Sequence, residues 1–516
     1  MTTSTPPTTA ALVGELTARF PSLFGGSAGG SGGGTARPTD RLRVALYLST
    51  RLGVDVRPQD VAEAGTVRRV ADFALGLVHS PRRAAALHRT PGAPAPLSHV
   101  QERMYLAEQV EPGNPDHSIV LAYLLGGPLD RTALRTAVTD VLTRHPVLRT
   151  AYGWDDSMSS VQRVWDTADL GEVVTLHPVA DDEDPLALAR RMAEEWWAAP
   201  FTLERPPFRA ALVPLGGERH LFLVNVHHIA FDGWSENVFL DDLAAFYRAR
   251  VEGVAADLPP VPGYQAYVHW ERDQRADWER WELPFWERTV TGLAAPRLDL
   301  PVPQPPGAQD GAVTAVRHRV ALDAPVVKAA LAYGRSRGAS PLGLLLSSTG
   351  EALRQQYGAG RVQVGTIFSG RVDREFDKVV GCFVNPVTIP LPHRPERSRA
   401  ERLAEDSRTV LECLSHARLP FDTVVRALTP RLGRGPWYEV LVLLHGEVTT
   451  RRLAPTVALR PLPVVPTVPP TTLTVEAVPD GTGGWVLTAR AHPDTPAGEL
   501  LHGIAAQLRL LAAGDG

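Results

Sequence analysis

Hydrophobic residues follow two spacings along the chain, and these predict strands and helices in alternation. Short apolar runs typical of buried strands occupy residues 120–127, 219–228, 361–370 and 438–446. Apolar residues at the spacing of amphipathic helices occupy residues 186–201, 236–251 and 341–358. Residues 263–290 carry four tryptophans among charged residues and predict one or two helices that join two lobes. The predicted fold class after about residue 95 is therefore α+β.

The first 85 residues have a different pattern and predict a small helical bundle. Leu12, Leu16 and Phe20 are spaced by four, and a further helix opens at Thr66. The run from Gly25 to Gly34 contains GxSxG twice, but it lacks the strand and helix that flank a nucleophilic serine, so it predicts a loop. The predicted divisions are 1–85 (helical domain), 86–97 (linker), 98–270 (first lobe) and 271–516 (second lobe).

Composition narrows the class of protein and the compartment. The chain has 516 residues, of which 44% are hydrophobic and 21% charged, with a net charge of -4. This balance gives no electrostatic reason to expect nucleic acid or an anionic membrane as a partner. Cys382 and Cys413 cannot form a disulfide framework and lack metal-ligand spacing. We find no secretory signal and no apolar window long enough for a membrane span, and we expect a cytoplasmic protein.

The segment VNVHHIAFDGW, residues 224–234, carries the candidate chemistry. Successive strand residues face opposite sides, so His227 and His228 point apart if the strand continues through both. That geometry argues against a shared metal ion, and no neighbouring residue completes a ligand set. Asp232 or Ser235 could cap the following helix. Two interpretations stay open: a capped corner with a core histidine, or a histidine that accepts a proton or orients a nucleophile in a cleft.

HHIAFDG matches HHxxxDG, the signature of condensation domains of nonribosomal peptide synthetases and of related chloramphenicol-acetyltransferase-like acyltransferases. Six further segments resemble the core motifs of that family, in order: SHVQERMYLA (98–107), RHPVLRTAY (144–152), YQAYVHW (264–270), VGCFVNP (380–386), HARLPFD (416–422) and GRGPWYEV (433–440). The first resembles SxAQxRMWxL, which leaves position 99 open. Ala266, Asp422 and Gly433 depart from the usual motif residues, at positions more often structural than chemical.

The resemblance implies two acetyltransferase-like lobes in a V-shape with a tunnel between them. Substrates bound to carrier proteins would enter from the two ends, one as an acyl thioester and the other as an amine or hydroxyl nucleophile. His228 holds the family's catalytic position, where members differ on whether the histidine is a general base or positions the nucleophile. His227 would be structural. Asp232 would be a structural aspartate paired with an arginine of the other lobe, for which Arg371 is the candidate; the alternative is a solvated turn arginine.

The resemblance assigns further residues around this site. Gly233 would keep the turn tight and present a backbone N–H to the developing oxyanion. Trp234, Ser235, Asn385 and Pro386 would line the substrate tunnel, although Asn385 could equally serve a structural turn. No metal and no directly bound cofactor is expected, because phosphopantetheine arrives on the partner carrier proteins.

Residues 43–74 resemble the second half of a carrier protein. The serine that would hold phosphopantetheine falls near Pro38, which has no hydroxyl, so we expect a degenerate carrier-like domain; a linker with an unrelated bundle is the alternative. No adenylation or thioesterase domain follows residue 516. We therefore expect a freestanding condensation enzyme acting in trans. The alternatives are a non-catalytic module that recruits carrier proteins, and an acyltransferase that uses a soluble coenzyme A thioester.

Overall fold

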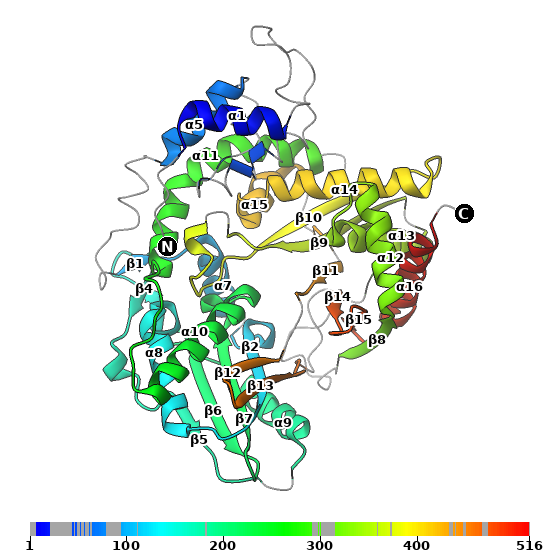
Figure 1. Cartoon of the computed structure of the whole chain (residues 1–516). Coiled ribbons are helices and arrows are strands. Elements are labelled where there is room, and N and C mark those ends of the chain that lie inside the picture. The colour runs from blue at the N-terminus through cyan, green and yellow to red at the C-terminus, as the bar shows by residue number, and fades with distance from the viewer. Residues whose placement is uncertain are drawn as a thin grey trace.

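The structure is a computed structural model, and Figure 1 shows the whole chain. It describes residues 7–20, 66–78, 94–110, 112–180, 183–290, 315–358, 360–371, 374–432, 440–446, 450–466 and 473–514, with isolated positions from 44 to 64 and at 298, 300, 437 and 438. The glycine run 25–34, Pro38 and the first eight residues of the predicted linker lie outside this set.

The first lobe is built on a six-stranded sheet in the order β12-β13-β2-β7-β6-β5. Its strands are β2 (Ser118–Gly126), β5 (Val174–Leu176), β6 (Phe208–Pro214), β7 (Arg219–His227), β12 (Arg451–Ala454) and β13 (Val457–Leu462). Helices α8 (Arg131–Arg144) and α10 (Gly233–Glu252) pack together, and α9 (Pro185–Ala198) packs against β2 and β7. Both faces of β7 contribute to apolar clusters, which explains why its sequence is apolar nearly throughout.

A small sheet and a helix lie beside this lobe. The three strands are β1 (Ala95–Pro96), β3 (Thr150–Trp154) and β4 (Ser160–Val164), in the order β1-β4-β3. Helix α7 (His99–Val110) follows β1. Short 3₁₀ turns complete the lobe: η1 (Pro115–His117), η2 (Pro146–Arg149), η3 (Thr167–Asp169) and η4 (His228–Ala230). The last of these turns begins at the second histidine of the HHIAFDG segment.

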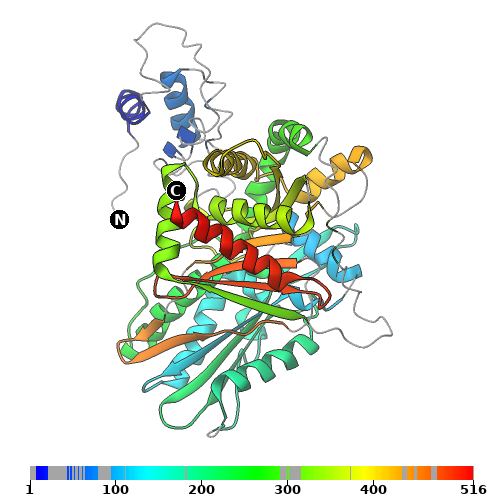
Figure 2. The same cartoon turned by 90° about the vertical axis from the view of Figure 1, so that its right-hand side faces the viewer.

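The second lobe has its own six-stranded sheet in the order β10-β9-β11-β14-β15-β8. Its strands are β8 (Val316–Leu322), β9 (Arg361–Phe368), β10 (Asn385–Pro392), β11 (Val440–Leu444), β14 (Leu473–Pro479) and β15 (Trp485–Ala491). Helix α16 (Ala497–Ala513) packs on α12 (Ala324–Ser336) and α13 (Pro341–Tyr357) and against β8 and β15 (Figure 2). The remaining elements are η5 (Arg374–Phe376), α14 (Arg399–Ser415) and α15 (Phe421–Leu432).

Two features cross the predicted boundary between the lobes at 270/271. Helix α11 (Tyr264–Val290) is continuous there, so the boundary falls inside a helix. The hairpin β12–β13 comes from the second half of the chain but pairs antiparallel with β2 of the first lobe, from Ala458 opposite Gly126 to Leu462 opposite Ala122. The two halves are therefore joined by a shared sheet as well as by a helix. Local periodicity cannot show either feature, because both depend on pairing between distant segments.

The N-terminal segment forms a separate small helical cluster. Helices α1 (Thr9–Arg19) and α5 (Val67–Val78) pack together, with Leu12 and Leu16 in one apolar core with Val70 and Ala74. Figure 1 shows these helices near α11. The predicted helical character is confirmed for these residues, whereas the resemblance to a carrier protein stays a prediction. Among the described helices, none combines the length and apolarity needed to cross a bilayer.

The contact between the exchanged hairpin and β2 gives a stability prediction. Gly127 has a φ of 113°, and a Cβ there would lie 1.9 Å from the backbone oxygen of Thr456 in the hairpin turn. Gly127→Ala should therefore destabilise the protein by about 2 kcal/mol or more, through backbone strain and displacement of the turn. The midpoint of urea unfolding measures this. Gly126→Ala is the matched control, because a Cβ at Gly126 meets nothing within 4 Å; equal midpoints for the two variants would contradict the prediction.

Candidate active site

The HHIAFDG segment forms a strand–turn–helix corner. Strand β7 ends at His227, the turn η4 covers His228 to Ala230, and α10 begins at Gly233. The carboxylate of Asp232 caps α10 by accepting a hydrogen bond from Ser235 N at 2.8 Å. The strand thus does not continue through His228, and it is this change of backbone direction that separates the two imidazoles.

His227 is buried and hydrogen-bonded on the side of Glu108. Its Nδ1 accepts a hydrogen bond from Ile229 N at 3.0 Å, inside the turn that presents His228. Its Nε2 lies 3.3 Å from Glu108 Oε1. Glu108 also binds His117 Nδ1 at 2.7 Å and Gly113 N at 2.9 Å. Burial opposes ionisation of Glu108, but the hydrogen bonds from His117, His227 and Gly113 outweigh it and hold its pKa far below the usual range.

Glu108, His117 and His227 form a possible metal-ligand set that the sequence analysis missed. Their ligand atoms lie within 4.8 Å of one another, so the expectation that nothing nearby completes a set was wrong. The hydrogen bonding nevertheless opposes a metal ion. Because His227 Nδ1 accepts an N–H, the proton of the neutral ring sits on Nε2, the nitrogen that would have to bind the metal. We interpret the three residues as a hydrogen-bonded cluster that supports the η4 turn.

His228 faces the other lobe. Its Nδ1 lies 3.5 Å from Cys382 Sγ, and its Nε2 makes no hydrogen bond among the described residues. Burial lowers the pKa of His228 below its ordinary value, so the ring is neutral at pH 7. Burial raises the pKa of the Cys382 thiol, which therefore stays protonated beside it.

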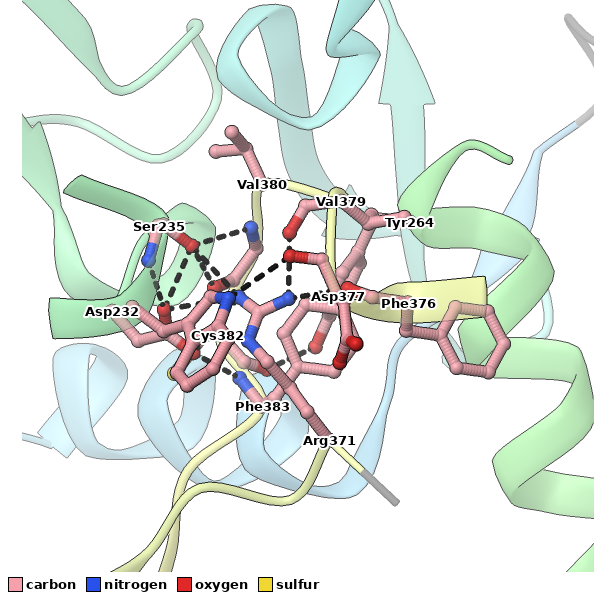
Figure 3. A network of polar contacts seen from close by, with 12 residues as sticks. Asp232, Ser235, Tyr264, Arg371, Phe376, Asp377, Val379, Val380, Cys382 and Phe383 are labelled. Atoms are coloured by element: carbon pink, nitrogen blue, oxygen red, sulfur yellow. Dashed lines mark hydrogen bonds and ion pairs between the residues drawn. The ribbon is translucent and has the colours of Figure 1, made fainter. Parts of the chain in front are cut away.

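The Asp232 carboxylate joins the two lobes through contacts with Arg371 and Phe383 (Figure 3). Its side chain is 1% exposed. Oδ1 accepts from Ser235 Oγ at 2.7 Å and lies 3.1 Å from Arg371 Nη2, and Oδ2 accepts from Phe383 N at 3.1 Å. The structure thus brings Arg371 of the second lobe against Asp232, so this arginine is not a solvated turn residue.

Arg371 uses its donors on both sides of the contact. Nη1 donates to the carbonyls of Phe376 at 2.6 Å and Val379 at 2.7 Å, and Nη2 also contacts Ser235 Oγ at 3.0 Å. The guanidinium carbon lies 3.9 Å from the centroid of the Phe383 ring. The side chain is 2% exposed. These contacts fix the loop that carries Cys382 next to His228.

Ser235 does not line an open tunnel, contrary to the sequence-based expectation. It is fully buried, and its hydroxyl lies 2.8 Å from Gly381 O and accepts from Gly381 N at 3.0 Å. Because Ser235 is the third residue of α10, its side chain points toward the second lobe and contacts Gly381 there. Trp234 is 48% exposed, as a tunnel residue would be, and its indole N–H donates to Asp377 O at 2.9 Å.

Gly233 opens α10 without steric need for glycine. Its φ is not in the left-handed region, and a Cβ there would meet nothing within 4 Å. The idea that glycine keeps the turn tight was therefore wrong, because the Asp232 cap already fixes the turn. Its backbone N–H belongs to the first helical turn, where such groups have no intrahelical partner.

Asn385 and Pro386 begin β10 rather than a loop. Asn385 donates from Nδ2 to the carbonyls of Ala417 at 2.8 Å and Leu419 at 2.9 Å, and its Oδ1 accepts from Phe421 N at 2.9 Å. The structural alternative for Asn385 is therefore the one observed, although the residue also borders a small cavity. Pro386 is buried opposite Ile367 of β9, so the tunnel assignment for Pro386 was wrong.

Two further residues hold the lobes together near His228. Tyr264, at the start of α11, hydrogen-bonds through its hydroxyl to Cys382 O and lies 2.9 Å from Ser98 Oγ. His145 bonds Asp242 through Nε2 at 2.7 Å and accepts from Val380 N through Nδ1 at 3.4 Å. Both lie in segments that resemble family motifs, and this resemblance is the sequence feature that could have identified them. Their partners were not predictable, since they lie 97 or more positions away in the chain.

Comparison with known proteins places this geometry in a family context. The family model of the condensation domain matches residues 93–435. The phosphinothricin tripeptide synthetase PhsB of Streptomyces viridochromogenes is 34% identical over 373 residues, which cover 70% of this chain and 30% of that protein. The chain thus spans about a third of the length of that curated relative.

Solved structures match the fold over most of the chain. The first condensation domain of the calcium-dependent antibiotic synthetase, solved with a substrate analogue, has a TM-score of 0.68 at 22% identity and covers 82% of this chain and 97% of that one. The X-domain from teicoplanin biosynthesis has a TM-score of 0.68 at 25% identity and covers 84% of this chain and 98% of that one.

The Asp232 contact generates a prediction about stability. Asp232→Asn should destabilise the protein by about 3 to 5 kcal/mol, because the amide leaves the Arg371 guanidinium buried without a counter-charge. Chemical denaturation measures the loss. Asp140→Asn is the control, since its partner Arg250 is 50% exposed and such a pair contributes about 1 kcal/mol or less. Similar losses for both variants would show that burial of the Asp232 pair does not matter.

Proposed function

Because the chain belongs to the condensation-domain family, and condensation domains form amide bonds, we propose that it is an acyltransferase of nonribosomal peptide synthesis. It joins an acyl or aminoacyl thioester held on a carrier protein to an amine, or forms an ester when the nucleophile is a hydroxyl. The observation that carries this proposal is the neutral His228, whose Nε2 makes no hydrogen bond among the described residues, just before the N-terminus of α10.

The proposed reaction uses His228 on the nucleophile. The nitrogen of the incoming amine attacks the thioester carbonyl, the C–N bond forms, the C–S bond breaks, and the phosphopantetheine thiol leaves. Nε2 of His228 accepts a hydrogen bond from the attacking amine and can take its proton. Cys382 Sγ lies at Nδ1, 3.5 Å away, so the contact with the second lobe does not occupy Nε2.

The N-terminus of α10 supplies the charge stabilisation in this proposal. The tetrahedral intermediate carries an oxyanion, and the Gly233 N–H at the start of a 20-residue helix offers a donor together with the positive end of the helix dipole. The open space beside Gly233 leaves room for a substrate atom. A backbone donor does this work without any glycine-specific conformation.

The acyl donor and the mode of supply belong to the same proposal. We propose that the acyl group arrives on a carrier protein of a separate chain, with phosphopantetheine as the arm. An acyl coenzyme A carries the same arm, so it is the alternative donor to compare directly. The degenerate carrier-like identity of residues 1–85 stays a prediction and is not needed for the chemistry.

A non-catalytic recruitment role is the second candidate. It is favoured by the likeness to the X-domain from teicoplanin biosynthesis, which has also been solved in complex with OxyB. The surroundings of His228 favour catalysis instead, because its Nε2 makes no hydrogen bond among the described residues. Binding of loaded carrier proteins without turnover would support the recruitment role.

The catalytic proposal predicts a specific loss on substitution of the second histidine. His228→Ala should lower kcat/KM for condensation of carrier-bound acyl groups with amines by about 10²- to 10⁴-fold, because positioning and proton acceptance are lost. The assay supplies loaded carrier proteins separately and follows the product by mass spectrometry. His393→Ala is the control, since His393 is exposed beyond the far end of β10. Normal turnover by the His228 variant would refute a histidine-dependent mechanism.

The protonation state of His228 predicts the acid limb of the pH profile. Burial lowers the pKa of this ring, so the neutral, accepting form persists below pH 6.5 and is lost only as the pH falls through the lowered value. The log of kcat/KM should therefore turn down below pH 6.5. An acid limb centred above pH 6.5 that disappears in His228→Ala would contradict the neutral assignment.

A further inference from the structure

A small cavity lies between the lobes next to the His228 site. Its volume is about 30 Å³, and α7, α11, the start of β10 and the segment before α15 border it. By this measure a water needs about 10 to 15 Å³, so the space fits two waters or a group of about three heavy atoms. Phe383 and Val384 border it and directly follow Cys382, whose sulfur lies 3.5 Å from His228 Nδ1.

His99 offers an unused hydrogen-bonding group to this cavity. The residue is 5% exposed and borders the cavity, and its Nε2 is buried without a hydrogen-bond partner among the described residues. Burial and the nearby Arg275 lower its pKa to about 4, so the ring is neutral at pH 7. A buried polar atom without a partner is costly, and this indicates that a ligand group or water completes it. Position 99 is one of three open positions in the motif SxAQxRMWxL that residues 98–107 resemble, and Arg103 matches its fixed arginine.

Arg103, one turn further along α7, borders the same cavity. Within the part of the chain that the structure describes, it has neither a hydrogen bond nor an ion pair. The neighbouring arginines differ: Arg272 binds Glu102 at 2.6 Å and Arg275 binds Glu279 at 2.9 Å. Arg103 lies close enough to Cys382, the neighbour of His228, to affect its thiol. The charge of Arg103 lowers the pKa of that thiol, although burial has the larger effect and raises it.

The two acids that border the cavity do not cancel this positive charge. Asp422 lies 3.2 Å from Arg426 and is compensated by it. Glu271 accepts hydrogen bonds from His99 N at 2.9 Å and Tyr267 Oη at 3.0 Å. Burial raises the pKa of Glu271 to about 7, so this group is only partly ionised at neutral pH. Arg418 also borders the cavity and has interactions of its own. The groups proposed to meet a ligand are the Arg103 guanidinium and the neutral imidazole of His99.

We infer that this cavity is a subsite for a carboxylate of the substrate, held by Arg103 and His99. A carboxylate has three heavy atoms and one negative charge, which suits the size of the cavity and the Arg103 guanidinium that borders it without an ion pair among the described residues. The inference rests on the proposed function, because it names a feature of the molecule that reacts at His228. The carboxylate has two possible sources: the main-chain acid of an untethered amino acid nucleophile, or the side-chain acid of a thioester-bound substrate.

Binding measurements on the full-length protein test the subsite without turnover. The probes for the first source are the twenty common amino acids and their primary amides; those for the second are succinyl-pantetheine and butyryl-pantetheine. A thermal-shift screen followed by calorimetry gives Kd. At least one acid should bind more tightly than its neutral counterpart, and Arg103→Gln should weaken that acid by about tenfold or more. The set of probes in which the acid binds more tightly than its neutral counterpart identifies the source of the carboxylate.

Two matched variants separate the subsite from general charge. Arg275→Gln removes an arginine that is already paired with Glu279, so the affinity for the acid should change less than twofold. His99→Phe keeps the charge of Arg103 but removes the hydrogen bond from the imidazole. It should weaken binding of the acid and leave binding of the neutral counterpart unchanged. The inference is wrong if no acid binds, if acids and neutral counterparts bind equally, or if Arg103→Gln and Arg275→Gln have equal effects. Acid binding without condensation would refute the proposed function alone.

Discussion

The buried carboxylate of Asp232 is the interaction on which the geometry around His228 depends. It caps α10 through Ser235 N at 2.8 Å, accepts from Phe383 N at 3.1 Å, and lies 3.1 Å from Arg371 Nη2. One group thus ends the turn after His228 and fixes the facing loop of the second lobe. A buried ion pair adds little net stability, but removing one partner leaves a charge without compensation. The pair therefore selects one arrangement of the lobes rather than raising the net stability of the protein.

This arrangement explains why His228 is a chemical group and His227 a structural one. His227 spends Nδ1 on the η4 turn at 3.0 Å and directs Nε2 to Glu108 at 3.3 Å. His228 has Nδ1 beside the Cys382 sulfur, and its Nε2 makes no hydrogen bond among the described residues. The Cys382 loop reaches His228 because Arg371 binds that loop and Asp232 together. The second lobe therefore fixes the surroundings of a histidine in the first.

Much of the fold could be predicted from the sequence, because strands such as β7 and helices such as α10 and α13 have strong local periodicity. The corner with its Asp232 cap was also readable, and the family motifs pointed to Arg371. What failed depends on contacts between distant segments. The hairpin β12–β13 joins β2 from more than 300 positions away, and Glu108 and His117 meet His227 only after the sheet forms. Ser235 had a spacing consistent with a tunnel residue, but the Gly381 backbone covers it.

The close packing of the lobes also limits where a substrate can lie. A Cβ on Gly381 would be 2.0 Å from the Tyr264 ring, and the Tyr264 hydroxyl already binds Cys382 O. On this side of His228 the lobes are in contact and leave no room for a chain of atoms. Phe383 connects the two regions, because its backbone N–H binds Asp232 and the residue also borders the polar cavity with His99 and Arg103. Space for recognition therefore remains at this cavity. There the Arg103 guanidinium, which has no ion pair among the described residues, can discriminate between substrates.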